Sequence, residues 1–392
     1  MKNSSSISTA TDGFDLSAVP LIDHHAHPVR RDQVLAGAAA FRRFFSESTD
    51  PGMAAHLGTT VFFRRAVRDL AALLGCEATE QAVLDVRARM TFPDYARRCF
   101  DAAGLRMLLL DGGFQTAESI GVEEMATLSG IPTVPILRIE TYVEELIERT
   151  STLAEVEEAL RARIRGARAE GIVALKSIAA YRGGLQVERR GKAEAEAALA
   201  EVRMAYRGAG RIRLANRPLL EYLLLIALEE AAASELPVQF HVAFGDDDAD
   251  LRLANPLQMR ALLQDARFRS VPIILLHCYP YVREAGYLAN LYSNVYVDVS
   301  LSVPLTAAGS SARFAEALEL APTSKVLFGT DAHSIPELFY VAALHGRRAL
   351  AACLRQLVAE DYLTVAEAEA AAEQILWQNA ARIYGLGRLN TG

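Results

Sequence analysis

The sequence predicts an α/β protein in which eight parallel strands form a (β/α)₈ barrel. Eight short apolar runs alternate with helical patterns along the 392 residues. Most runs are continuously hydrophobic, as strands buried on both faces of a parallel sheet are. Neither G-x-G-x-x-G nor G-x-x-x-x-G-K-[ST] is present, so the dinucleotide-binding and P-loop versions of an open sheet lack their motifs. Eight repeats favour the closed barrel over a doubly wound sheet.

The order of the expected elements follows from these runs. The expected strands are residues 19–24, 105–111, 133–139, 172–177, 237–242, 271–277, 294–300 and 325–331. Helical patterns fill the segments between them.

Two longer helical segments, about 30–100 and 181–235, are expected as insertions after the first and fourth strands. Both leave the C-terminal ends of strands, where barrel active sites lie. They could therefore cap the site, pack outside the barrel or form a subunit contact. We expect a single domain over 1–392, with the barrel core at about 19–335 and C-terminal helices at 336–392.

Composition narrows the class of function. Hydrophobic residues make up 51% of the chain, which is enough for a packed core, and the net charge of −7 argues against a nucleic-acid binder. The four cysteines are far apart and are expected to be free thiols. Residues 1–13 lack the apolar segment of a secretory signal, and no stretch is long enough to span a bilayer. We expect a cytoplasmic protein with a small-molecule substrate and no nucleic-acid or membrane partner; a homo-oligomer remains open.

Histidines follow the first expected strand in the segment IDHHAHP. Residues two apart in an extended backbone point the same way, so His25 and His27 can bind one ion together. His24 is expected to point to the other side, where it would pack or support a ligand.

Three more candidate ligands end later strands. His241 ends the fifth strand, His277 the sixth and Asp331 the eighth. Strand ends of a barrel converge on one mouth, and imidazole and carboxylate are ligands of Zn²⁺ and similar divalent ions. A single histidine at a strand end is usually a core residue, but the joint pattern favours a metal site.

Five segments together resemble the amidohydrolase superfamily of metal-dependent barrel hydrolases. The resemblance covers residues 19–335 and is closest to the amidohydrolase-like domain of FluG-type and nodulin-type glutamine synthetase fusions. The segments are IDHHAHP, ALKSIAAYRGGL, QFHVAFGD, LLHCYP and LFGTDAH.

The resemblance implies roles for the candidate ligands. His25, His27 and Asp331 would bind a buried metal, with zinc the expected ion. His241 and His277 would bind a second ion, or His241 would complete a one-metal site. In two-metal members, a lysine at the place of Lys176 is carboxylated by CO₂ and bridges the ions. Alternatively, Lys176 holds a substrate carboxylate or pairs with an acid.

The resemblance also implies a reaction in which a metal-activated water attacks an amide or ester carbonyl. Asp331 would move the proton to the leaving group, with His277 as a second catalytic residue. The expected substrate contacts are Arg138, Tyr181, Arg182 and Tyr279. The expected function is cleavage of a C–N bond in a small carboxylate-bearing molecule. The alternatives are a decarboxylase or sugar-acid isomerase, or a binding protein without catalysis.

Overall fold

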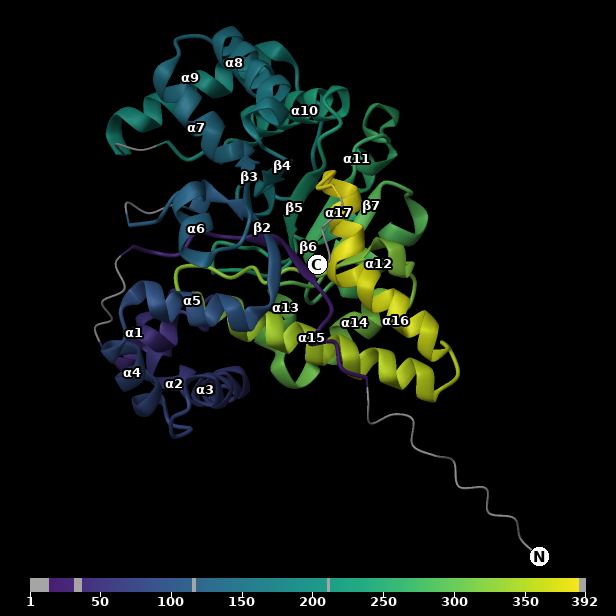
Figure 1. The fold of residues 1–392 in the computed structure, drawn as a ribbon. Helices are drawn as coiled ribbons and strands as arrows, with labels where there is room; N and C mark the ends of the chain where they lie inside the picture. Colours follow the sequence, from purple (N-terminus) through teal and green to yellow (C-terminus); the bar gives the residue numbers. More distant parts are fainter. Residues whose placement is uncertain (1–13, 32–36, 115–117, 210–211, 388–392) are drawn as a thin grey trace, which may run out of the picture.

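The computed structural model describes residues 14–31, 37–114, 118–209 and 212–387, so the expectation for residues 1–13 lies outside the described residues. Its centre is one parallel sheet in the sequential order β1 to β8, with helices between the strands (Figure 1). This confirms the expected barrel class, and a strand overlaps each of the eight expected runs, although β1 extends two residues beyond the expected 19–24. The strands are β1 Leu21–Ala26, β2 Leu105–Asp111, β3 Thr133–Arg138, β4 Ala174–Ser177, β5 Val238–Val242, β6 Ile273–His277, β7 Val295–Asp298 and β8 Val326–Leu327.

The first and last strands are joined through the segment after β8. β8 is shorter than the expected 325–331, because the chain leaves the strand ladder at Phe328. The Asp331 backbone N–H donates to the His25 carbonyl at 3.0 Å, and the His27 N–H donates to the Ala332 carbonyl at 2.8 Å. Gly329 permits this approach, since a Cβ there would lie 3.2 Å from the His25 nitrogen. These contacts bring the two ends of the sheet together.

Apolar side chains fill the interior of the barrel and the layer around it. An inner cluster includes Ile22, Ile136 and Ile274, with Tyr384 of α17 (Asn379–Tyr384) packed against them. A larger outer cluster lies between the strands and the surrounding helices. Burial on both faces explains why the strands are read as continuous hydrophobic runs.

The helices of the two insertions gather on opposite sides of the sheet in Figure 1. The first insertion contains α1 (Ala38–Arg43), α2 (Ala54–Leu57), α3 (Val61–Leu74) and α4 (Glu80–Arg89), followed by α5 (Phe92–Ala103) before β2. The second contains α9 (Lys192–Ala209) and α10 (Arg217–Ala233), and α10 packs on α8 (Leu153–Gly166). The described part of the first insertion excludes 32–36.

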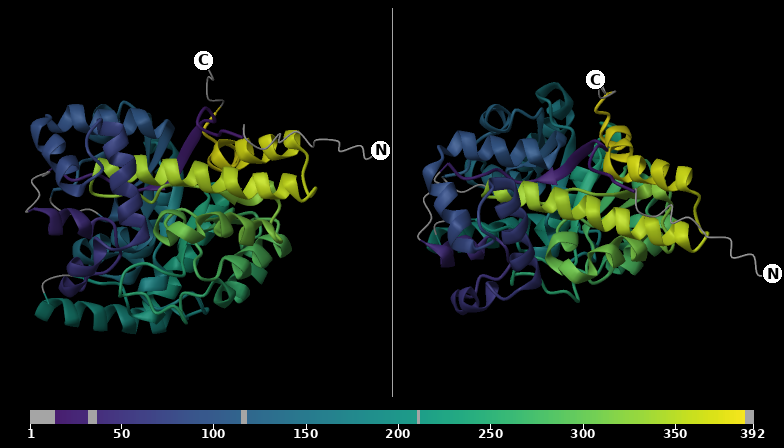
Figure 2. Two further views of the ribbon diagram at one scale, coloured as in Figure 1. Left: turned by 90° about the horizontal axis from the view of Figure 1, so that it is seen from below. Right: turned by 60° about the horizontal axis from the view of Figure 1, so that its bottom comes forward.

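Helices after the barrel cover its outside. Figure 2 shows α15 (Pro336–Ala359) and α16 (Val365–Glu373) lying along one side of the molecule, ahead of a π-helical turn, η9 (Gln374–Gln378). Every helix in the described ranges is too short or too polar to cross a lipid bilayer. The remaining α-helices are α6 Val122–Ser129, α7 Ile139–Arg149, α11 Arg260–Gln264, α12 Val282–Leu291, α13 Ser302–Thr306 and α14 Ser310–Leu318.

Threonines mark the starts of several helices. The Thr60, Thr79 and Thr91 side chains accept hydrogen bonds from backbone N–H groups at the starts of α3, α4 and α5. Thr152 and Thr364 form reciprocal capping boxes with a glutamate three residues later. Each such cap stabilises a helix by about 1 kcal/mol, because it pairs N–H groups that the helix leaves free.

Buried ion pairs attach the first insertion to α15. The Asp69 carboxylate of α3 lies 2.9 Å from His345 Nε2 and 2.8 Å from Arg348 Nη1. The buried Glu337 carboxylate accepts from Arg87 Nε of α4 at 2.7 Å. These contacts hold the insertion against the barrel wall.

Candidate metal centre

A pocket of about 410 Å³ contains the candidate ligands from the C-terminal ends of the strands. Both insertions contribute to its wall, since residues 46–49 come from the first and Arg213 from the second. The candidate ligands that line it are His25, His27, Lys176, His241, His277 and Asp331.

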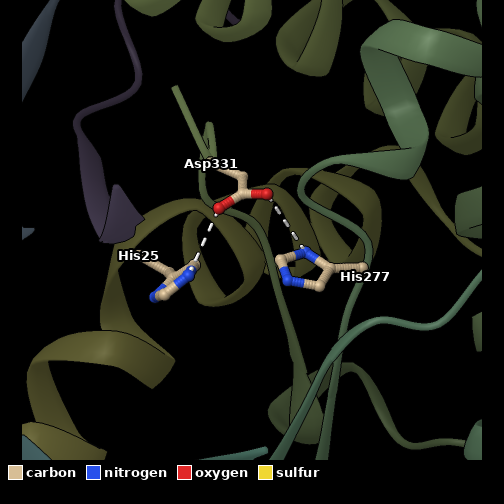
Figure 3. Close-up of side chains that lie close together, drawn as sticks. All are labelled: His25, His277 and Asp331. Carbon is tan, nitrogen blue, oxygen red and sulfur yellow. Dashed lines mark ion pairs between the residues drawn. The ribbon is translucent and has the colours of Figure 1, made fainter. Parts of the chain in front are cut away.

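Three imidazoles converge on the Asp331 carboxylate. Asp331 Oδ1 lies 3.2 Å from His25 Nε2 and 3.3 Å from His27 Nε2, and Oδ2 lies 3.6 Å from His277 Nδ1. Figure 3 shows His25 and His277 on either side of this carboxylate. His25, His277 and Asp331 are all buried and lie close enough to share one ion. Side chains from β1, β6 and the segment after β8 therefore meet at one point.

The hydrogen bonds around this point fit a cation. His27 Nδ1 donates to the Asp111 carbonyl at 2.9 Å, so its Nε2 carries a lone pair that faces Asp331 Oδ1. That buried oxygen accepts no hydrogen bond from the described residues. Two lone pairs that face each other in a buried site are costly unless a positive ion lies between them. The donor set thus fits a divalent metal, with His25, His27 and Asp331 as its holders.

The protonation states also suit metal binding. Burial lowers the pKa of His25 to about 4 and holds the pKa values of His241 and His277 well below the ordinary value. Burial acts to raise the pKa of Asp331, but the neighbouring His277 and His25 hold it well below its usual range. Neutral imidazole and ionised carboxylate are the forms that bind metals.

Lys176 lies among these groups at the end of β4. Its side chain is buried, and Nζ lies 3.2 Å from His25 Nε2. Burial lowers the pKa of Lys176 to about 8, although the charges of Asp111 and Asp331 oppose this. At pH 7 about a tenth of such a lysine is the neutral amine, against about one part in 3,000 at the ordinary pKa. The neutral form is the one that reacts with CO₂.

His241 is close to the cluster but is turned partly away. Its ring lies 4.5 Å from the His277 ring and 4.3 Å from the Tyr181 ring, measured between centroids. Nε2 donates to the Phe244 carbonyl at 3.0 Å, so Nδ1 is the atom left to bind an ion. His241 therefore lies beside the proposed metal position and does not contact the Asp331 carboxylate as His25 and His27 do.

A chain of buried hydrogen bonds supports His277. Its Nδ1 donates to Ser300 Oγ at 3.0 Å, and that hydroxyl donates to Asp298. Asp298 also accepts the His277 backbone N–H at 3.0 Å and His24 Nε2 at 2.8 Å. This leaves His277 Nε2 with the free lone pair. Such outer contacts orient a ligand and set its tautomer.

His24 is buried in the barrel interior, where its ring stacks on Tyr384 and donates to Asp298, the carboxylate that also holds His277. A register shift between Asp23 and Ala26 places an extra residue on β1 relative to β2. A bulge of this kind re-aims side chains. His24 and the adjacent His25 consequently both reach side chains across the barrel, Asp298 and Lys176 respectively. Simple alternation did not predict this.

Two candidate ligands have left-handed backbones. The φ angle is 69° at His277 and 50° at Asp331. Non-glycine residues adopt this conformation at a cost of about 1 kcal/mol or more, and such residues concentrate at functional sites. The hydrogen bonds from the Asp331 N–H to the His25 carbonyl and from the His277 N–H to the Asp298 carboxylate hold these conformations in place.

Asp111 is a site residue that the sequence interpretation missed. It is buried at the end of β2, close enough to His25 and His27 to share an ion with them. Its carboxylate instead accepts from Arg138 Nη2 at 2.7 Å and Nε at 3.1 Å. The position at the C-terminal end of a strand was the available signal.

The expected substrate contacts divide into two groups. Arg138, Tyr181 and Arg182 line the pocket. Tyr279 is not among its lining residues in the described ranges, contrary to our expectation. It packs edge-on against Phe244 at 5.5 Å, with the Arg313 guanidinium over its ring. The turn after β6 directs it to the wall of the molecule.

Charged residues that the sequence interpretation did not select also line the pocket, although Asp246 ends the quoted segment QFHVAFGD. They are Glu47 of the first insertion, Arg213 of the second, and Asp246 and Asp248 after β5. Burial, with the charges of Asp331 and Asp246, raises the pKa of Glu47 to about 8. Burial also raises the pKa of Asp246, although the hydrogen bond from the Asp248 backbone N–H opposes this. Their place depends on how the insertions fold back, which no local pattern reports.

The barrel and its group of imidazoles and carboxylate define the class of metal-dependent barrel enzymes. The model of the Amidohydrolase family matches residues 151–386, and the chain belongs to this family.

Known proteins resemble the chain over most of its length. A Lactobacillus casei protein described as a candidate metal-dependent hydrolase is 34% identical, with a TM-score of 0.86 over 96% of this chain and 99% of its own. Protein fluG of Emericella nidulans is 27% identical over 94% of this chain, which spans 46% of that protein.

A more distant likeness concerns the fold alone. Uronate isomerase from Thermotoga maritima has a TM-score of 0.68 at 16% identity, over 94% of this chain and 95% of its own.

Proposed function

We propose that the protein is a metal-dependent hydrolase that cleaves the C–N bond of a small carboxylate-bearing amide. The observation that supports this most strongly is the convergence of His25, His27 and His277 on the buried Asp331 carboxylate. Family membership supports an enzymatic activity of this general kind.

In this proposal, His25, His27 and Asp331 hold the ion, with His241 and His277 beside it, and zinc is the expected metal. The ion supplies an acidified water and a Lewis acid for the carbonyl group. The Asp331 carboxylate accepts the proton of the attacking water and returns it to the leaving amine. His277, fixed through Ser300, lies on the other side of that carboxylate, and its Nε2 lone pair would bind the ion or accept a proton from the substrate.

In this proposal, the chemical state of Lys176 determines whether the site holds one metal ion or two. In the two-metal form, its neutral amine attacks CO₂, an N–C bond forms, one proton leaves to solvent, and a carbamate with two oxygens results. The burial of Lys176 and its 3.2 Å approach to His25 favour this form. Carbon-13 bicarbonate would then give a protein-bound carbamate signal that disappears in Lys176→Met.

Metal content and turnover test the proposal together. We expect the purified protein to hold stoichiometric zinc or a similar ion, and His25→Ala and Asp331→Ala to lose it. His56→Ala, on the exposed side of α2, is the matched control and should retain it. The loaded protein should release amine or ammonia from a panel of small carboxylate-bearing amides. Metal retention in both ligand variants, or isomerisation of a sugar acid without amide cleavage, would contradict the proposal.

A further inference from the structure

We propose that the substrate is a zwitterion, with a carboxylate held near Arg182 and an ammonium group held by Glu47 and Asp246. This inference rests on the proposed function and specifies the charge of the molecule that enters the same pocket. It follows from the pattern of charges in the pocket wall and from the pairs that those charges do and do not form.

Of the three arginines that line the pocket, Arg182 has the weakest ion pair. Arg138 is paired with Asp111 at 2.7 Å, and Arg213 is paired with Asp248 at 3.0 Å. Arg182 has only Glu144 at 3.7 Å, and its buried Nε has no hydrogen-bond partner among the described residues. Glu144 is already engaged, since it accepts the Leu214 N–H at 2.7 Å.

Arg182 is therefore available to an anion. Burial and the nearby positive charge of Arg213 lower the pKa of Arg182, so a negative group at this place would relieve an existing repulsion. A guanidinium binds a carboxylate through two parallel hydrogen bonds. The pocket thus has one place suited to a substrate carboxylate.

The negative side has two carboxylates, Glu47 and Asp246, that form no ion pair with a described residue; Arg213, whose charge reaches Asp246, is itself paired with Asp248. Glu47 is partly buried and forms no hydrogen bond or ion pair with another described residue. Among the described residues, the Asp246 carboxylate accepts a hydrogen bond only from the backbone N–H of Asp248, at 3.1 Å. Glu47 lies within electrostatic reach of Asp246 and of Asp331. Like charges in a partly buried wall destabilise each other, so Glu47 keeps its proton at pH 7 unless a cation is bound, and an ammonium group would take the place of that proton.

An ammonium group would meet that requirement. The candidate metal is held by residues from the strand ends, whereas Glu47 and Asp246 belong to an insertion and a loop. A dicarboxylate would place its second anion against these two acids and would offer no positive charge to pair with them. A sugar acid would offer only neutral hydroxyl groups there. The wall therefore favours a molecule with both charges.

Matched small molecules test this assignment by calorimetry on the metal-loaded protein. The probes are L-aspartate and L-glutamate, their counterparts without the amino group, succinate and glutarate, and D-glucuronate. We expect each amino acid to bind about ten-fold or more tightly than its deaminated counterpart, the effect of one partly buried ion pair. Binding is measured without turnover, so its outcome is separate from the hydrolysis test.

Variants assign the preference to particular side chains. Glu47→Gln and Asp246→Asn should each reduce the amino-acid preference, and together they should abolish it. Arg182→Gln should weaken amino acid and diacid alike and leave their ratio unchanged. Asp101→Asn is the matched control, because Asp101 is exposed on α5 and does not line this pocket, and it should alter neither.

The inference is overturned by equal affinities within each pair, by stronger binding of glucuronate, or by no binding of any probe to the wild-type protein. A preference that persists in the Glu47→Gln, Asp246→Asn double variant also overturns it, because the amino group would then contact the metal directly. If the protein holds its metal and cleaves amides but shows no preference, only this inference fails. If it holds no metal, the proposed function fails.

Discussion

Gly346 on α15 offers a direct test of how tightly the end of the barrel is packed. A Cβ at this position would overlap the Phe328 ring, with Cε2 2.9 Å away and two further ring carbons closer. Phe328 is fully buried immediately after β8, and its ring lies 5.9 Å from that of Phe314. The ring therefore has little room to move aside.

Two effects of Gly346→Ala oppose each other. Replacing glycine by alanine within a helix stabilises it by about 1 kcal/mol. Overpacking a closed core costs about 1–3 kcal/mol and sometimes more, because side chains and backbone must shift. Since the overlap involves several ring atoms, we expect the steric cost to exceed the helical gain and the free energy of unfolding to fall by about 1–2 kcal/mol.

Urea unfolding followed by circular dichroism measures this change. Gly166→Ala is the matched control: it ends α8, its φ is −81°, and its nearest new contact is Glu170 Oε1 at 3.4 Å. We expect this control to be neutral or slightly stabilising. Phe328→Leu combined with Gly346→Ala should cost less than the two single changes added together. A Gly346→Ala protein as stable as Gly166→Ala would refute the reasoning.

Three further predictions concern charge and close approach. Asp69→Asn should lower stability at pH 7. Burial acts to raise the pKa of Asp69, but His345 and two arginines hold this pKa below the unfolded value of about 3.9. The ionised carboxylate therefore stabilises the fold fully above about pH 4, and this stabilisation is lost as the pH falls further. In urea titrations, the difference in unfolding free energy between Asp69→Asn and wild type should narrow below about pH 4. Glu337→Gln should cost about 3–5 kcal/mol by the same assay, because it breaks a buried ion pair. Gly245→Ala would place a Cβ on the Tyr181 hydroxyl, so amide turnover should fall about 100-fold with metal content unchanged.

For each of these three predictions, one result would contradict the reasoning. A constant gap between Asp69→Asn and wild type from pH 7 to pH 3 would mean that the carboxylate gains nothing from its partners. A Glu337→Gln change within the range of surface substitutions would mean that the pair is exposed to water. Loss of metal in Gly245→Ala would place the damage at the ligands rather than at Tyr181.

The strands were predictable because burial on both faces gives an unambiguous apolar run. The ends of the strands were harder to predict. β8 was expected to reach Asp331, but the strand ends at Leu327. Gly329 and the left-handed Asp331 carry the chain across β1 instead. That path depends on contacts with a strand far away in the sequence.

The residues of the site also differ in how well the sequence predicts them. The histidines stand at strand ends, where barrel geometry alone brings side chains together. Glu47 follows a short helix in an irregular segment, and only the folded insertion brings it into the pocket. His24 was placed by alternation, which the bulge in β1 interrupts.

The backbone contact between β1 and the segment after β8 has a consequence for how the chain opens. The proposed ligands His25 and His27 lie on one side of that joint and Asp331 on the other. An ion shared by them would tie the start of the barrel to its finish, so cation binding and ring closure would form a single equilibrium. Stripping the metal with a chelator would then loosen the ring at this joint first, which faster amide exchange in β1 would report.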